Sequence, residues 1–312
     1  MSAAQAVVTG AAEPGRGPRQ DRAPGTRARR AANQPSGIFG TRRMTKTRLV
    51  CAIILAILSV FPLLYMLSLS FQPVGDILSP TPELLPLNPT FANYISAWSS
   101  NSFSLYFANS AIVSVATIVL TVCVAILAAL GFARYRFHLR EVIFYLFLAS
   151  LAVPAVELIL PQYLLMQRLG LIDSRVGLIL IYSAQNLPFA IFFLRGFFET
   201  IPKELEEAMR IDGAGTIRVL RSLIMPLSAP AIATVAVLTF NTAWDEFVVA
   251  LTLINSPDKR TLPVGLEAFQ GAHQTAWGPL FAASMIATVP TILVYVAAQR
   301  WFQRGFSVGA IH

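Results

Sequence analysis

The sequence predicts an all-α polytopic membrane protein with six transmembrane helices, and three observations support this prediction. Hydrophobic residues make up 55% of the chain and charged residues only 13%, whereas soluble proteins carry about 25% charged residues. Several apolar runs reach the roughly 20 residues that a helix needs to cross the hydrocarbon core of a bilayer. The basic residues behind the net charge of +8 follow the ends of these runs, as membrane topology requires, so no nucleic-acid partner is expected.

The first 46 residues differ in composition from the rest of the chain. They are rich in Ala, Gly, Pro and Arg and contain almost no large apolar side chains, so they cannot bury enough surface to offset the entropy of ordering. We expect residues 1–46 to form a disordered cytoplasmic tail and residues 47–312 to form one six-helix domain. No small-residue cleavage site follows the first apolar run, so we expect that span to be retained.

Six apolar runs are long enough to be spans. They are expected near residues 49–71, 106–132, 142–160, 176–198, 227–254 and 279–302. Pro154 and Glu157 interrupt the third run, and Asn186 and Pro188 interrupt the fourth. Because such breaks would expose backbone groups to lipid, we expect them to face neighbouring helices or a wet cavity. A short amphipathic helix near residues 91–98 is expected to lie on the membrane surface.

The distribution of Lys and Arg predicts the orientation of the spans. One set of alternating loops holds the basic tail and ten further cations, and the opposite set holds only Arg168, Arg175, Lys259 and Arg260. Cytoplasmic loops carry the excess of Lys and Arg in membrane proteins. We therefore expect a multi-pass protein with both termini, and the loop between the fourth and fifth spans, in the cytoplasm.

That loop, residues 202–226, begins with the pattern of a short helix. Pro202 suits the first turn, where its missing N–H costs nothing, and the acidic residues after it favour the positive end of the helix dipole. Leu205, Ala208 and Met209 fall on one face at helical spacing and form a small apolar stripe. An amphipathic helix of this kind fits a groove on a soluble partner, with its acids facing basic residues there.

The second half of the loop predicts a turn and another helix. Gly213 is placed to end the first helix in a left-handed conformation, and Thr216 could cap a second helix that Pro226 stops. From the pattern alone, a solvated connector without a partner is an equally open interpretation.

This loop resembles the glutamate-alanine-alanine loop of permease subunits in binding-protein-dependent ABC importers. The matching positions are Glu207, Ala208, Gly213 and Pro226. Met209 departs from that loop, because it stands where the motif usually has a second Ala. The resemblance extends to carbohydrate-uptake permeases of the maltose type (second permease) through residues 158–161, 169–174, 243–247 and 299–302.

The resemblance implies a type I ABC importer permease fold, with a core at about residues 105–303 and a coupling loop at 202–226. It implies residues that dock an ATPase, namely Glu206, Glu207, Ala208, Met209, Asp212, Gly213, Ala214 and Pro226. It also implies a chain that carries a sugar or related polyol across the cytoplasmic (inner) membrane of a prokaryote. The partners would be a second, different permease chain, two ABC ATPase subunits and an extracytoplasmic solute-binding protein.

ATP and Mg²⁺ would lie on the partner ATPases, so this chain is expected to bind no cofactor and to be no enzyme. It lacks the phosphate-cradling Walker pattern. Cys51 and Cys123 lie inside apolar runs and not at metal-ligand spacing, so no metal site is expected.

Polar side chains inside the spans are candidates for the solute pathway. A charge near the bilayer centre costs about 3 kcal/mol or more, so such groups face a cavity or a partner. The candidates are Glu157, Asn186, Asn241, Trp244, Asp245 and Glu246. A sugar site would use acceptors for hydroxyls and an aromatic ring against the apolar sugar face. Hydrogen bonding between helices, or a gate, is the alternative role for the same residues.

Two other functional classes fit the sequence less well. An ion-gradient-driven secondary transporter would use Asp245 or Glu246 as a proton carrier, but the chain shows no paired inverted half. A membrane-embedded enzyme would need clustered His, Ser or acidic residues at one membrane depth, and the sequence offers no convincing set.

Overall fold

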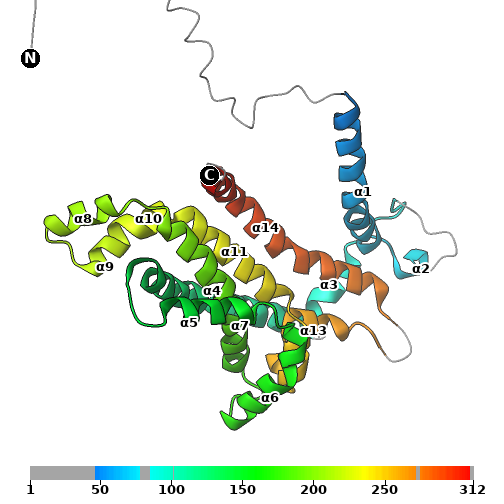
Figure 1. Ribbon diagram of the computed structural model, residues 1–312. Coiled ribbons are helices and arrows are strands. Elements are labelled where there is room, and N and C mark those ends of the chain that lie inside the picture. Colours follow the sequence, from blue (N-terminus) through cyan, green and yellow to red (C-terminus); the bar gives the residue numbers. More distant parts are fainter. Residues whose placement is uncertain (1–45, 78–84, 101, 272–274, 310–312) are drawn as a thin grey trace, which may run out of the picture. The chain divides into compact units, whose positions relative to one another are not determined.

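The computed structural model describes residues 46–77, 85–100, 102–271 and 275–309, and these are folded almost entirely into helices (Figure 1). The α-helices are α1 (Lys46–Ser70), α2 (Val74–Ile77), α3 (Ala92–Ser99), α4 (Phe103–Arg134), α5 (Arg140–Ser150), α6 (Ile159–Arg168), α7 (Arg175–Glu199), α8 (Lys203–Ile211), α9 (Thr216–Val219), α10 (Met225–Leu227), α11 (Ala229–Asp245), α12 (Val248–Leu253), α13 (Leu262–Glu267) and α14 (Trp277–Gly309). Within the described ranges, extended pairing is limited to an isolated bridge between Gln270 and Thr275. Residues 1–45 of the expected tail (1–46) lie outside the described residues, so its disorder stays a prediction, while Lys46 begins α1.

Six spans are present if each bent pair of helices counts as one. By length and composition, α1, α4, α7 and the Trp277–Gln299 part of α14 can each cross a membrane. The first bent pair joins α5 to residues 155–168 at 100°, and the second joins residues 216–227 to α11 at 77°. The all-α, six-span prediction is therefore confirmed in this form.

The chain divides into two units between Ile57 and Leu58. In the first, the described residues form the beginning of α1. In the second, α4 and α7 form the centre of the packing, and α11 lies against both. Ala125, Ala129 and Ala190 belong to one apolar cluster there and are at most 1% exposed. Small side chains let helix backbones approach closely, which is how helices associate in a membrane.

Outward-facing apolar side chains fit a lipid environment. Leu127 on α4, Leu146 on α5 and Leu293 on α14 are each more than half exposed. Monomeric soluble proteins rarely expose large contiguous apolar surface, whereas a bilayer accepts it.

The interruptions of the spans differ in part from those predicted. The third span breaks where expected, since α5 ends at Ser150 and the chain continues at a right angle after Pro154. The prediction of a break in the fourth span is wrong, because α7 continues without interruption through Asn186 and Pro188. Pro188 is buried among the packed helices, where neighbours can satisfy the backbone group that a proline leaves free.

Both ends of the fifth span differ from those predicted. The helix continues past Pro226 to Leu227 after a π-helical turn (Leu220–Ile224), and the chain bends at Ser228 instead. At the other end, the backbone of Glu246 leaves the helical region (φ −69°, ψ 127°). α12 then begins as a separate helix.

The candidate coupling loop lies at one end of the second unit. Figure 1 shows α8 and α9 at the end of the helices that is remote from α6 and α13. The expected surface helix near residues 91–98 forms as α3, and its contact with the membrane surface remains a prediction.

Candidate functional site

The candidate coupling loop folds as α8, a tight turn and α9. Gly213 adopts φ +80°, which a residue with a Cβ rarely does. The Ala214 amide donates to the Met209 carbonyl at 2.9 Å, and the Gly213 amide donates to the Arg210 carbonyl at 3.0 Å. These two bonds form a Schellman motif, which satisfies carbonyls at a helix end. The predicted left-handed conformation of Gly213 is confirmed. The predicted cap at Thr216 is wrong, because Thr216 is the first residue of α9 and Gly215 is its N-cap.

The outer surface of the loop combines charged side chains of both signs with apolar ones. Glu207, Ala208, Asp212, Gly213 and Pro226 are exposed, whereas Met209 is half-buried and Ala214 is buried.

Three large apolar side chains on this surface are left exposed by the described residues. Leu205 is 45% exposed, Ile217 68% and Ile211 87%. Sequence reasoning missed Ile211 and Ile217 as surface residues, although Ile211 follows Ala208 at a helical spacing of three.

Glu206 was predicted to lie on the docking surface, but its side chain is buried. Its carboxylate accepts a hydrogen bond from Arg134 Nε at 2.5 Å, and both side chains are less than a tenth exposed. The second terminal nitrogen of Arg134, Nη2, donates to the Phe198 carbonyl at 2.8 Å and to the Ile201 carbonyl at 3.1 Å. The structure therefore places this acid in an intramolecular ion pair.

Glu246, a solute-pathway candidate, is engaged by the protein itself. Its carboxylate accepts the backbone amides of Val249 (2.7 Å) and Ala250 (3.0 Å) in the first turn of α12. Tyr182 of α7 donates its hydroxyl to the same carboxylate at 2.6 Å. These contacts satisfy the free N–H groups of a helix start and support the alternative, structural role.

Asn186 is also engaged between helices. Its amide nitrogen donates to the Tyr182 carbonyl at 2.8 Å, and its amide oxygen accepts the Thr242 hydroxyl of α11 at 2.8 Å. Asn241 is exposed on α11, and Glu157 is exposed in the short 3₁₀ turn (Ala155–Leu158) between α5 and α6. Of the six pathway candidates, Trp244 and Asp245 are the two that line the cavity described next.

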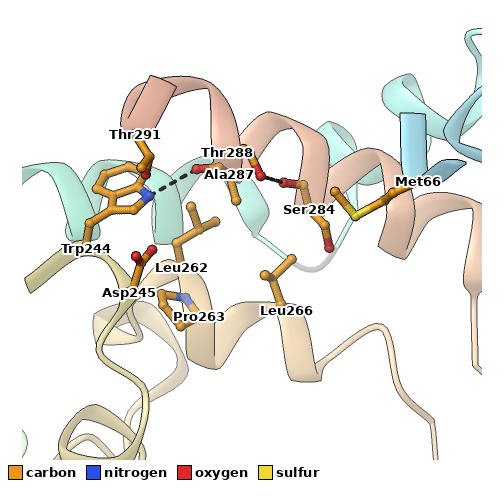
Figure 2. Close-up of a pocket in the computed structure, with 10 residues that line it drawn as sticks. All are labelled: Met66, Trp244, Asp245, Leu262, Pro263, Leu266, Ser284, Ala287, Thr288 and Thr291. Carbon is orange, nitrogen blue, oxygen red and sulfur yellow. Dashed lines mark hydrogen bonds between the residues drawn. The ribbon is translucent and has the colours of Figure 1, made fainter. Parts of the chain in front are cut away.

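Trp244 and Asp245 line a cavity of about 470 Å³ between α11, α13 and α14 (Figure 2). The remaining lining residues are mainly apolar or hydroxylated, namely Met66, Leu262, Pro263, Leu266, Ser284, Ala287, Thr288 and Thr291. Trp244 is 3% exposed, and its indole nitrogen donates to the Ala287 carbonyl at 3.0 Å. The Asp245 carboxylate lies beside it, so the cavity wall carries an acceptor, while the buried indole packs against Phe107 and Phe240.

At the opposite end of the unit from α8, Asp173 joins two loops. Its carboxylate accepts the amides of Asn255 (3.0 Å) and Ser256 (2.9 Å), the Ser256 hydroxyl (2.6 Å) and the Lys259 ammonium (2.8 Å). The bonds from Lys259 and then from Ser256 hold the pKa of Asp173 well below its ordinary value. Sequence reasoning recorded Asp173 only within a matching motif and missed this role, because its partners lie about 80 residues away.

Within the described ranges, no group of three or more His, Cys, Asp or Glu side chains is placed to hold a metal ion. Cys51 and Cys123 are both unpaired and exposed.

Residues 121–308 match a protein family described as the binding-protein-dependent transport system inner membrane component. The chain is 36% identical over 270 residues to the diacetylchitobiose uptake system permease protein NgcG of Streptomyces coelicolor, covering 86% of this chain and 89% of the relative. It is 34% identical over 264 residues to the sulfoquinovosyl glycerol transport system permease protein SmoH of Agrobacterium fabrum, covering 85% and 93%.

A solved structure agrees with these relatives. The fold is similar, with a TM-score of 0.73 and 26% identity, to a chain of a bacterial ABC transporter involved in the import of the acidic polysaccharide alginate. The similarity covers 82% of this chain and 95% of that one. The type I importer fold implied by the resemblance is confirmed, and nothing supports the ion-gradient alternative. The chain belongs to the family of binding-protein-dependent transport system inner membrane components, the permease subunits of ABC importers.

Proposed function

We propose that this chain is one permease half of an importer that carries a sugar or related polyol across the cytoplasmic membrane of a prokaryote. Two relatives support the sugar class, since one is named for diacetylchitobiose uptake and the other for sulfoquinovosyl glycerol transport. The cavity beside Trp244 and Asp245 offers a carboxylate acceptor, which suits sugar hydroxyls. Its volume is within the usual range of about 300–1,000 Å³ for ligand pockets.

The importer would contain four further subunits. Two ABC ATPases would lie in the cytoplasm, a second and different permease chain would complete the pore, and a solute-binding protein would deliver the sugar from outside. ATP and Mg²⁺ would be bound by the ATPases, so this chain would perform no catalysis. The excess of Lys and Arg in one set of loops supports an orientation with both termini and α8 in the cytoplasm.

The observation that carries the proposal is the outer surface of α8. Ile211 is 87% exposed at the end of this helix, and Glu207 and Asp212 are exposed near it. An apolar ridge flanked by acids fits a groove on a soluble partner that has basic residues on its rim. Docking of an ATPase would cover the apolar side chains and pair the acids.

ATP binding would then drive the permease between two states. Closure of the ATPases would displace α8, and the helices attached to it would change from an inward-facing to an outward-facing arrangement. A ligand can shift such an equilibrium only by its difference in affinity for the two states. The ATPases and the loaded binding protein must therefore each prefer one state of the permease, which couples their binding across the membrane.

Co-purification from mild detergent tests this proposal. The wild-type chain should bring down a soluble ATPase and a second six-span chain, and the mass of the ligand held by the binding protein should identify the solute. A double variant, Glu207→Arg with Gly213→Val, should insert in the membrane but recover no ATPase, because it reverses an exposed charge and strains the turn.

The matched control is Glu267→Arg, the same charge reversal at an exposed position of α13, away from α8. It should recover the ATPase as the wild type does. Normal ATPase recovery and normal transport by the double variant would contradict docking through α8.

A further inference from the structure

Three helix ends meet at the guanidinium of Arg134. Arg134 is the last residue of α4, and its side chain is 7% exposed. It bonds the carbonyls of Phe198 and Ile201, at and just after the end of α7, and the carboxylate of Glu206 in the first turn of α8. The planar guanidinium donates in several fixed directions at once, so one side chain joins all three elements.

The pair is the main attachment of α8 to the helices behind it. Of the nine residues of α8, all of them described, Glu206 is the buried one, and Met209 is half-buried against the apolar cluster. The chain after the turn is held differently, since Val219, Leu220 and Ile224 are buried in that cluster. Loss of the ion pair would therefore free α8 while the following turns stay packed.

Burial distinguishes this pair from an ordinary surface ion pair. Exposed pairs contribute little, whereas removal of one partner from a buried pair leaves an uncompensated charge and is strongly destabilising. Arg136, two residues further along, is exposed and makes no hydrogen bond or ion pair with the described residues. If these arginines served only as cytoplasmic positive charge, both could stay exposed. Arg134 is instead buried and bonded to three partners.

We propose that Arg134 is a positioning residue for transport, which makes α4, α7 and α8 move as one body when α8 is displaced. This inference rests on the proposed function, because it supplies the path by which docking at α8 reaches the membrane-spanning helices. α4 and α7 form the centre of the packing, so a rigid joint at their ends transmits a displacement of α8 to both. Without the joint, α8 would move with its partner and the helices would lag behind.

The first test compares the charge-removing variants Arg134→Gln and Glu206→Gln in the full importer reconstituted in liposomes. Coupling free energies between sites typically correspond to about 5- to 150-fold, so we expect solute uptake per ATP hydrolysed to fall about tenfold. ATPase recovery and ATP hydrolysis should persist, because the outer surface of α8 is unchanged. The matched control is Arg136→Gln, at an exposed position just after α4, and it should keep the wild-type ratio.

The second test restores the joint by other means. The background has Cys51 and Cys123 replaced by Ser. In it, the double variant Arg134→Cys with Glu206→Cys should import little solute per ATP hydrolysed until a short bifunctional thiol reagent links the two positions. Linking should then return uptake per ATP toward the background value. A merely structural role predicts no such rescue, since the link adds no charge and no bonds to Phe198 or Ile201.

Unaltered uptake per ATP in both Gln variants would overturn the inference. Uptake per ATP that stays low after the two cysteines are linked would overturn it as well. The wild-type importer separates this failure from failure of the proposed function. If the wild type recruits no ATPase or imports without ATP, the proposed function is lost. If it imports with ATP and the variants match it, only the role of Arg134 is lost.

Discussion

At the scale of the residue, Asp173 shows how one carboxylate can order two loops. Four donors from residues 255–259 converge on its two oxygens, and its own carbonyl accepts a further bond from Lys259. Asp173 also takes a positive φ of 54°, a conformation that Asp tolerates better than most residues. The loop after α12 is therefore held against the loop before α7 by ionised Asp173.

This arrangement predicts a pH dependence. The folded-state pKa of Asp173 is lowered by the bonds from Lys259 and Ser256, so its stabilising effect is complete above the ordinary Asp pKa of about 3.9. As the pH falls from there towards the lowered folded-state pKa, the carboxylate is protonated and the effect is lost. Amide hydrogen exchange at Asn255 and Ser256, corrected for its intrinsic pH dependence, should show constant protection from pH 7 to about pH 4 and a decline below.

The variant Asp173→Asn supplies the control for that prediction. It should show weaker protection at both amides near neutral pH, because it loses the ionised acceptor, and no decline on acidification. Equal protection in variant and wild type at all pH values would show that other contacts order the loop.

At the scale of the element, the break between α11 and α12 depends on Glu246. Hydropathy alone predicts one span through residue 254, and the apolar side chains do continue to Leu253. The helix nevertheless ends at Asp245, because Glu246 turns out of it and bonds two amides of the next helix and Tyr182 of α7. A tertiary partner from another helix is invisible to a hydropathy window, and so the break could not be placed from the sequence.

The variant Glu246→Ala tests whether this residue is structural. It should destabilise the protein by about 2 kcal/mol, because it removes hydrogen bonds to a charged acceptor and leaves buried donors unpaired. Asp245→Ala, at the neighbouring exposed position, should change stability much less. Thermal unfolding in detergent measures both. Similar melting of the two variants would return Glu246 to the list of solute-pathway candidates.

Other elements were predicted more successfully because their signals are local. Gly213 marks the left-handed end of α8 by its residue type alone, and the bond pattern around it is formed by neighbouring residues. The break after α5 follows Pro154, which cannot continue a helix without losing a hydrogen bond. Pro188 carries the same local signal, yet α7 continues through it, since packing by other helices outweighs the local preference.

At the scale of the whole molecule, the sequence identified the family and the loop but not the connection between the loop and the spans. The docking motif lies within 20 residues or so and keeps its spacing in any structure, so it could be read directly. Arg134 and Glu206 are 72 positions apart, and nothing local to Glu206 distinguishes it from exposed Glu204 and Glu207. Likewise, only the folded structure shows Asp245 beside a cavity and Asn186 engaged between two helices.

ATP-dependent uptake in liposomes tests the central claim most directly, with this chain alone compared with the chain assembled with its ATPases, second permease and solute-binding protein. The account predicts that the assembly imports the solute when ATP is supplied on the side of α8, and that the chain alone imports nothing under a proton or sodium gradient. Uptake by the isolated chain under such a gradient, or import by the full assembly without ATP, would contradict it.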